Sequence, residues 1–238
     1  MKYIGQSVPR LDARAKVRGE AVFTSDMKLP GQAYMKVLLA GRPHAIIRNI
    51  HTQQAEALPG VLAVLTSRDV PCNEFGYYTY DQPVLCGPSA KPYADRVRYV
   101  GDRVAAVVAE TEEIARNALD LIQVDYEDLP VVSDVEEAMS PQAPVLHPDV
   151  GSNVFAHHIL RNGDIQTGFR QADVIVEAVY NTPAQEHAYL ETEAGIACID
   201  EDGRIAIMTN GQWGVKDRKQ IAHALDLPEE RVRVIYPM

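Results

Sequence analysis

Cysteine is scarce in this chain, which has only three among its 238 residues: Cys72, Cys86 and Cys198. They lie far apart and none belongs to a C-x-x-C pair, so zinc ribbons and cysteine-ligated iron–sulfur clusters are not expected in this chain. A disulfide framework is equally unexpected for a chain of this size with so few thiols. We therefore predict three ordinary reduced thiols.

Long hydrophobic runs and clustered positive charge are also missing. No window approaches the run of about eighteen apolar residues that a membrane-spanning helix needs. The chain start has no apolar core after its positive charges, unlike a signal peptide. The net charge is −10 without a basic stripe, which disfavours nucleic-acid binding. These features predict a cytoplasmic protein that binds neither nucleic acid nor membrane.

Three common motifs are absent as well. The chain has no G-x-x-x-x-G-K-[ST], no G-x-G-x-x-G and no G-x-S-x-G, so P-loop, Rossmann and hydrolase functions lack their signatures. What is present is a near-average globular composition, 46% hydrophobic and 24% charged, which excludes wholesale disorder. At this length about two domains are expected.

The first half of the chain alternates between predicted strands and helices. A helix is expected to follow the N-cap candidate Thr111, because apolar residues then recur at helical spacing. The long, proline-rich stretch after Val70 is predicted to be a loop that is functional or packed against a partner. This pattern predicts an α/β domain over roughly residues 15–130. The expected strands are 32–39, 61–66, 103–109 and 123–127, with a short helix over 51–58.

The second half begins with a predicted linker, residues 130–150, which holds four prolines. Beyond it, residues 173–180 alternate like a half-buried strand. A hairpin is expected around the turn Asp200-Glu201-Asp202-Gly203. A helix over 215–225 and a strand over 232–236 complete the expected elements.

One polar segment, Pro183-Ala184-Gln185-Glu186-His187-Ala188-Tyr189-Leu190-Glu191-Thr192, is a candidate site, because it follows an apolar strand. The amide of Gln185 can both donate and accept hydrogen bonds, which suits it to an oxo or hydroxyl group. The residues alone leave an ordinary polar loop open as the alternative. The adjacent His157 and His158 are poor metal-ligand candidates, because their side chains would point to opposite faces of a strand.

Five collinear stretches resemble the molybdenum-binding subunit of the xanthine dehydrogenase/aldehyde oxidase family. Their order, which spans almost the whole chain, is more specific than any single match. They are Gly5 to Phe23 (GQSVPRLDARAKVRGEAVF), Leu58 to Val70 (LPGVLAVLTSRDV), Tyr99 to Pro130, Gln185 to Thr192, and Pro228 to Met238 (PEERVRVIYPM).

The resemblance implies an α/β (α+β) fold: an N-terminal arm over 1–16, an α/β hammerhead domain over 17–127 and a linker over 128–150. The beginning of a mixed α/β molybdopterin-binding domain follows over 151–238. The family hydroxylates purines or aldehydes with water as oxygen source at molybdenum held by molybdopterin, and passes electrons through 2Fe-2S clusters to FAD. The implied partners are the remainder of the molybdenum subunit, an FAD-binding subunit and a 2Fe-2S subunit.

By the same resemblance, Gln185 matches a family glutamine that hydrogen-bonds an oxo ligand of molybdenum. Gln212 matches a family glutamine near the second strand of the cofactor domain, and both glutamines are expected to bind the cofactor. Glu186, His187, Tyr189 and Glu191 are expected to support the orientation of these groups. No direct protein ligand to the metal is expected. The family's glycine-rich G-G-x-F-G-G stretch and its glutamate general base are not found in this sequence.

Two functions follow from these observations. The first is part of a molybdenum hydroxylase that is inactive as an isolated chain, with xanthine or hypoxanthine as the first substrate to test. The second is a non-catalytic scaffold or interaction module of the same family. Limited proteolysis is expected to leave a resistant core ending near residue 130 in the second case.

Overall fold

The computed structural model describes residues 4–189 and 191–237. Residues 1–3 of the expected arm, Leu190 of the candidate segment and Met238 lie outside the described residues. In chain order the elements are α1 (Ala13–Val17), η1 (Thr24–Asp26), β1 (Tyr34–Leu39), β2 (Ala45–His51), α2 (Gln53–Glu56), β3 (Val61–Leu65), β4 (Arg96–Val97), β5 (Arg103–Ala109), α3 (Glu112–Leu119), β6 (Gln123–Asp128), α4 (Val135–Ala138), α5 (Ile165–Gln171), β7 (Gly195–Ile199), β8 (Ile205–Thr209), α6 (Gly214–Ala224), η2 (Glu229–Arg231) and β9 (Val232–Ile235).

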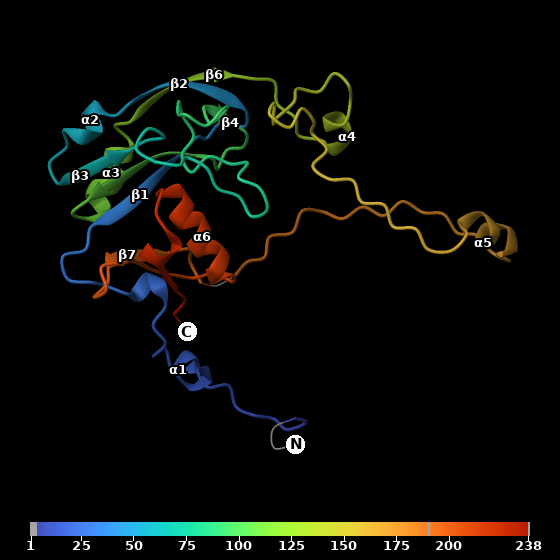
Figure 1. Cartoon of the computed structure of the whole chain (residues 1–238), viewed down its shortest axis with the longest axis horizontal. Helices are drawn as coiled ribbons and strands as arrows, with labels where there is room; N and C mark the ends of the chain where they lie inside the picture. The colour runs from blue at the N-terminus through green and yellow to red at the C-terminus, as the bar shows by residue number, and fades with distance from the viewer. Residues whose placement is uncertain (1–3, 190, 238) are drawn as a thin grey trace.

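The first unit, residues 34–128, holds two three-stranded antiparallel sheets (Figure 1). One sheet has the strand order β1-β5-β3 and the other β4-β2-β6. The four strands expected here and the helix after Thr111 are confirmed within one or two residues. The helix expected over residues 51–58 is only α2, because His51 ends a strand that the sequence did not indicate, β2.

Strand β5 is the centre of the first unit because both of its faces are buried. Ala105, Val107 and Ala109 face a cluster that includes Ala115 and Ala118 of α3, where small side chains let the helix approach the sheet. Val104 joins a second cluster of buried residues, completed by Ala40, Ala45, Ile47, Cys86 and Val97. These two clusters form the apolar core of the first unit.

All three cysteines are free thiols, as predicted. Burial raises the pKa of Cys86 to about 12, so this thiol stays protonated and unreactive at neutral pH.

Helix α3 begins at a side-chain cap, because the Thr111 hydroxyl accepts a hydrogen bond from the Ile114 backbone N–H at 3.2 Å. Replacing Thr111 by alanine removes this acceptor and is expected to cost about 0.5–2 kcal/mol of unfolding free energy. Urea unfolding of the Thr111→Ala and Thr111→Ser variants tests this expectation. Serine keeps the hydroxyl, so a loss of equal size in both variants would contradict a capping role.

The predicted linker lies against the first unit over part of its length. The Arg98 Nε–H donates to the Leu146 carbonyl at 2.8 Å. The Asn153 amide donates to the carbonyls of Ala138 and Pro144, both at 3.0 Å. These contacts fix the chain before it leaves the body of the molecule.

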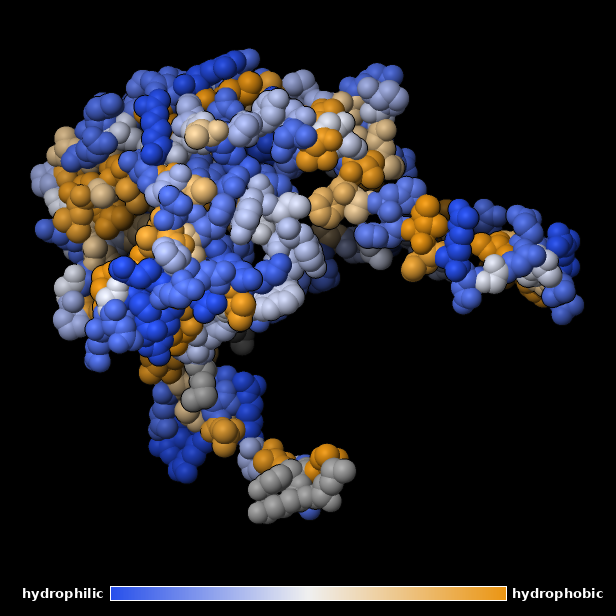
Figure 2. Space-filling view, in the orientation of Figure 1, coloured by the Kyte–Doolittle hydropathy of each residue, from blue (hydrophilic) through white to orange (hydrophobic). Residues whose placement is uncertain are grey.

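Between residues 153 and 194 the chain makes a long excursion through α5 and back (Figure 1). Residues 173–180 form no strand here, so the half-buried strand predicted for them is wrong. Val174, Val176 and Val179 are 78%, 82% and 87% exposed. The segment is extended as its alternation predicts, but no described strand pairs with it. Figure 2 shows apolar surface along this excursion.

The second unit, residues 195–235, is a three-stranded sheet of order β7-β8-β9 with α6 packed on β9. The predicted hairpin is confirmed as the antiparallel pair β7–β8, and the expected final helix and strand are α6 and β9. Strand β9 runs parallel to β8 after the crossover through α6. The mixed α/β class expected from the sequence is therefore correct. Among the described residues, no helix has the length and apolar character needed to cross a membrane.

Candidate functional site

Gln185 lies near the end of the excursion, in an exposed, extended part of the chain. Its amide makes one long hydrogen bond, from Nε2 to the Glu186 carbonyl at 3.4 Å. The Glu186 carboxylate accepts from the His187 backbone N–H at 3.0 Å. The Tyr189 hydroxyl donates to Glu193 at 3.1 Å, which raises the pKa of Tyr189. These side chains thus contact their own neighbours and leave the Gln185 amide oxygen available to a ligand.

Glu191 has different neighbours, because it lines a cavity of about 580 Å³ beside the N-terminal residues. Arg10 and Lys16 contribute to this cavity, and both pair with Asp12, at 2.5 and 2.6 Å. The hydrogen bonds from Arg10 and Lys16 lower the pKa of Asp12 to about 2. Glu191 therefore faces a cavity of mixed charge, away from the groups around Gln185.

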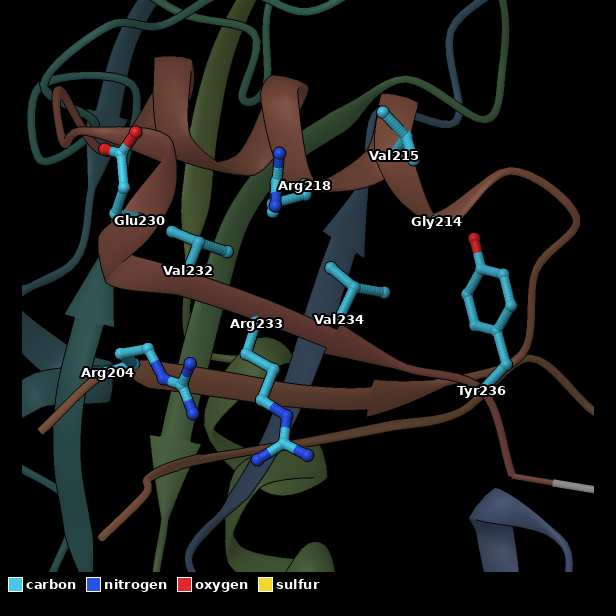
Figure 3. Close-up of a pocket in the computed structure, with 9 residues that line it drawn as sticks. All are labelled: Arg204, Gly214, Val215, Arg218, Glu230, Val232, Arg233, Val234 and Tyr236. Carbon is cyan, nitrogen blue, oxygen red and sulfur yellow. The ribbon is translucent and has the colours of Figure 1, made fainter. Parts of the chain in front are cut away.

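Gln212 lies in the Gly211–Gly214 turn that leads from β8 into α6. Its neighbour Trp213 packs against Tyr77 of the first unit, with ring centroids 5.3 Å apart. The Tyr236 ring lies beside the turn (Figure 3), and its hydroxyl accepts a hydrogen bond from the Trp213 backbone N–H at 3.2 Å. The Gln212 side chain makes no hydrogen bond within the described part of the chain, so its amide is available to a ligand.

The two glutamine amides come from separate elements, and no hydrogen bond joins them within residues 4–189 and 191–237. The candidate site is therefore a pair of separated, solvent-facing amides. Amides of this kind donate to oxygen acceptors and accept from N–H and O–H donors without carrying charge. This chemistry fits a polar, oxygen-rich ligand.

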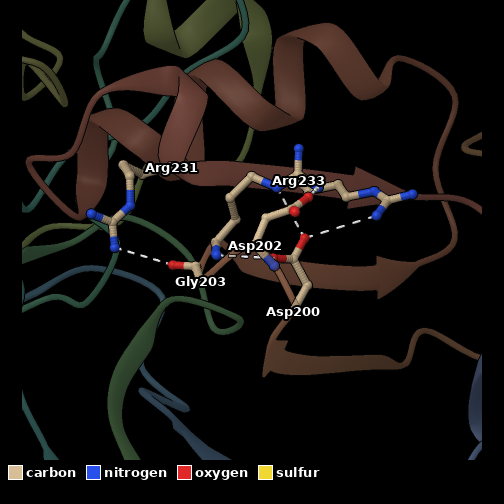
Figure 4. Close-up of polar contacts among 6 residues, drawn as sticks. Asp200, Asp202, Gly203, Arg231 and Arg233 are labelled. Carbon is tan, nitrogen blue, oxygen red and sulfur yellow. Dashed lines mark hydrogen bonds and ion pairs between the residues drawn. The ribbon is translucent and has the colours of Figure 1, made fainter.

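A groove of about 630 Å³ between α6 and β9 was not indicated by the sequence (Figure 3). Arg204, Arg218 and Arg233 line it, yet each has an acidic partner. Asp200 lies 3.0 Å from Arg204 and 3.8 Å from Arg233, and Glu229 lies 2.8 Å from Arg218. The network around Asp200 also holds Asp202 at the hairpin turn (Figure 4). These arginines stabilise the second unit and leave little free positive charge for an anion.

The proline-rich loop of the first unit packs along α6, in a contact that we call the clasp, formed by residues 72–77 and α6. The Cys72 N–H donates to the Ala224 carbonyl at 3.0 Å, and the Gly76 N–H donates to Gln220 at 3.2 Å. The Lys216 ammonium donates to the Tyr77 carbonyl at 2.8 Å. The long loop thus has the packing role that its length suggested, and its partner is the second unit of the same chain.

The clasp contains three side chains of metal-binding type, Cys72, Glu74 and His223, whose ligand atoms lie within 4.8 Å of one another. The Glu74 oxygens already have partners, because His223 Nε2 lies 2.9 Å from one and Lys91 Nζ lies 3.0 Å from the other. The His223 ring also stacks on Tyr80, with centroids 4.1 Å apart. The cluster is therefore explained as a hydrogen-bonded contact between the two units, supported by the Lys91–Glu74 ion pair of the first unit.

This contact predicts acid sensitivity. Burial raises the pKa of Glu74, but the hydrogen bonds from His223 and Lys91 outweigh burial and leave the pKa lowered. The carboxylate therefore stabilises the fold above its unfolded pKa of about 4.3 and loses this effect as the pH falls through the lowered folded value. Replacing Glu74 by glutamine is expected to flatten the fall in melting temperature between about pH 5 and pH 3.

Thermal unfolding across this pH range, for wild type and Glu74→Gln, measures the effect. Glu177→Gln is the matched control, because Glu177 is exposed in the excursion and has no cationic partner among the described residues. The prediction fails if the melting temperatures of both variants fall between about pH 5 and pH 3 as steeply as that of the wild type.

Comparison with known proteins agrees with this architecture. Residues 18–130 match the family "Aldehyde oxidase and xanthine dehydrogenase, a/b hammerhead domain". Residues 146–238 match the family "Molybdopterin cofactor-binding domain". The two families together cover both units and most of the chain between them.

Individual relatives give the same result. The chain is 46% identical over 227 residues to a probable xanthine dehydrogenase subunit of Bacillus subtilis, with 95% of this chain and 29% of the relative covered. It is 33% identical over 233 residues to the nicotinate dehydrogenase large molybdopterin subunit of Eubacterium barkeri, with 98% of this chain and 53% of the relative covered. The chain thus spans between about a third and a half of these relatives.

A solved structure shares the fold. The aldehyde oxidoreductase of Desulfovibrio gigas aligns with a TM-score of 0.85 and 28% identity, with 98% of this chain and 26% of that chain covered. The match extends over the hammerhead unit, the excursion and the second sheet. Agreement of all three parts in the same order is not expected by chance. The chain accordingly belongs to the xanthine dehydrogenase/aldehyde oxidase family and corresponds to part of its molybdenum-binding subunit.

Proposed function

We propose that this chain is part of a molybdenum hydroxylase, in which it helps to hold molybdopterin-bound molybdenum. The observation that carries the proposal is the exposed Gln185 amide, whose N–H group is engaged only in one long hydrogen bond of 3.4 Å and can therefore donate to an oxygen ligand, in a chain of this family. The Gln212 amide offers a second uncharged group of the same kind. Both fit a cofactor that presents oxygen atoms and N–H groups.

Each residue has a defined task in this proposal. Gln185 donates a hydrogen bond that orients the metal centre, and Gln212 binds the cofactor near the start of α6. Glu186, His187 and Tyr189 fix the chain around Gln185 through local contacts, as the bond from Tyr189 to Glu193 illustrates. Glu191 is proposed to support the segment from the cavity beside the N-terminal residues. When bound, the cofactor supplies two-electron oxidation of the substrate with oxygen from water. The chain supplies orientation and hydrogen bonds.

The domain limits proposed for this function are an arm over 1–16, the hammerhead domain over 17–127, a linker over 128–150 and cofactor-binding residues from 151 onward. The remainder of the molybdenum subunit, an FAD-binding subunit and a 2Fe-2S subunit are the proposed partners, in the cytoplasm. The general base that the reaction needs is proposed to come from a partner segment, because no such glutamate was identified in this sequence.

The proposed substrate is a nitrogen heterocycle, with xanthine or hypoxanthine first. The two relatives named above are called xanthine dehydrogenase and nicotinate dehydrogenase subunits, and both names refer to heteroaromatic substrates. An aldehyde is the second class to test, since the aligned structure is an aldehyde oxidoreductase.

Metal analysis of the chain, purified with its partners from the native host, tests the proposal. We expect about one molybdenum per chain, with iron and flavin co-purifying, and hydroxylation of xanthine with oxygen from labelled water. A complex that contains neither molybdenum nor hydroxylase activity would refute the proposal.

The exposure of residues 173–189 favours one alternative, a scaffold without catalysis, because every described residue of this segment is exposed. Limited proteolysis of the purified complex separates the two functions. A hydroxylase subunit is expected to be protected across residues 173–189 by its partners, whereas a scaffold leaves this segment open to cleavage.

A further inference from the structure

We propose that Tyr236 and Asp217 form a positioning pair that fixes the Gly211–Gly214 turn and thereby aims the Gln212 amide. This inference rests on the cofactor-binding role proposed for Gln212. Neither residue carries the proposed chemistry itself, and both act through the backbone of Trp213.

The pair holds the turn through a short chain of hydrogen bonds. The Trp213 N–H donates to the Tyr236 hydroxyl at 3.2 Å, and that hydroxyl donates to the Asp217 carboxylate. The Asp217 N–H in turn donates to the Trp213 carbonyl at 3.1 Å. Both backbone polar groups of Trp213 are therefore hydrogen-bonded. Its N–H bonds to Tyr236 and its carbonyl bonds to Asp217 of α6. Gln212 directly precedes this fixed residue.

The protonation of Tyr236 suits this role. Burial and the hydrogen bond to Asp217 raise the pKa of Tyr236 to about 12. The hydroxyl therefore keeps its proton at neutral pH, so it can accept from Trp213 and donate to Asp217 at the same time.

Packing at Gly211 points to the same close contact. A Cβ atom at Gly211 would lie 2.6 Å from the Tyr236 hydroxyl oxygen and 2.7 Å from its ring carbon Cζ, which is closer than real Cβ atoms approach. The backbone at Gly211 is not left-handed, so glycine is needed there for space rather than for conformation. The Tyr236 ring thus occupies the space beside Gly211, the residue before Gln212.

The other side of Trp213 is held by the clasp. Its ring lies 5.3 Å from the Tyr77 ring, and the Lys216 ammonium lies 5.7 Å from its centroid. The backbone of Trp213 is thus held within the second unit, while its ring contacts Tyr77 of the first unit and Lys216 of α6. A turn held in this way fixes the point and the direction from which the Gln212 side chain leaves the backbone, which favours its use in orienting a bound group.

Hydrogen exchange of the assembled, partner-containing complex tests the pair. In Tyr236→Phe the ring stays and only the hydroxyl is lost, so we expect the Trp213 amide to exchange about tenfold faster, the effect of one lost hydrogen bond. Turnover is expected to fall about tenfold with KM little changed, because a misplaced orienting group affects kcat first. Tyr99→Phe is the control, since the Tyr99 hydroxyl makes no hydrogen bond among the described residues.

Gly211→Ala gives an independent measure. The added methyl collides with Tyr236, so this variant is expected to raise exchange in the turn, and the added Tyr236→Ala change is expected to remove the collision. The double variant should then be less impaired than the sum of the two single variants. Strict additivity would contradict the packing argument.

The outcomes separate this inference from the proposed function. Unchanged exchange at Trp213 in Tyr236→Phe overturns the positioning pair. Faster exchange with wild-type molybdenum content and turnover also overturns it, because the turn would then move without consequence. A wild-type complex without molybdenum refutes the proposed function instead, whatever the exchange measurement gives.

Discussion

Replacing Gln185 by alanine in the assembled complex is expected to lower turnover about 10- to 100-fold, the range for losing a group that orients a metal centre. The fold is expected to be unaffected, because the Gln185 side chain is exposed and makes only one long hydrogen bond. Steady-state hydroxylation and molybdenum content, measured on the same preparation, give both quantities.

Gln166→Ala is the matched control for this variant. Gln166 is also exposed and lies on α5 of the same excursion, but no role in cofactor binding is proposed for it. Equal losses of turnover in the two variants would show that truncating exposed glutamines of the excursion lowers activity non-specifically. Such a result would remove the basis for assigning Gln185 a specific role.

Replacing Ile47 by alanine is expected to have the largest effect on stability, about 2–5 kcal/mol of unfolding free energy. Ile47 is 1% exposed and packs with Ala45, Val97 and Val104 in the second core cluster. The loss combines removed apolar area with the cavity left behind. Denaturant unfolding followed by circular dichroism measures it.

Ile159→Ala provides the comparison, because Ile159 is 63% exposed in the excursion. Its truncation is expected to change the unfolding free energy by less than about 0.5 kcal/mol. If both isoleucines gave the same small change, the β4-β2-β6 sheet would not be part of the stable core.

The sequence predicted those elements whose signals are local. Helix α3 has its cap at Thr111 and its apolar spacing within eight residues, and β5 is, after Arg103, a continuous run of alanines and valines. The hairpin β7–β8 is marked by its Asp-Gly turn. In each case the residues that define the element are neighbours in the chain.

Elements that depend on distant partners were missed. Strand β2 pairs with β6, more than seventy residues later, and its register shifts between Ile47 and Asn49. This irregularity breaks the alternation by which a strand is recognised. Residues 173–180 show the opposite case, because they have the alternating pattern of a strand but no partner strand among the residues that the structure describes.

The candidate site shows the same difference between features with a local sequence signal and features that depend on distant contacts. The sequence identifies Gln185 and Gln212 by residue type and by family resemblance, because both signals can be read directly from the order of residues. The support of Gln212 by Tyr236 and the clasp depends on contacts between α6, β9 and a loop more than a hundred residues earlier. Such contacts leave no local pattern.

The open segment 173–180 also affects how the protein must be produced. An extended, β-branched stretch with unpaired backbone groups is a template for pairing with its own copies. Asp173 and Glu177 are its only charged residues, which is weak protection against aggregation. Chains synthesised without the partners proposed above are therefore expected to accumulate as insoluble material at high concentration, and co-expression with those partners is expected to recover more protein than refolding. In the proposed complex, the order in which the subunits are made thus becomes a determinant of yield.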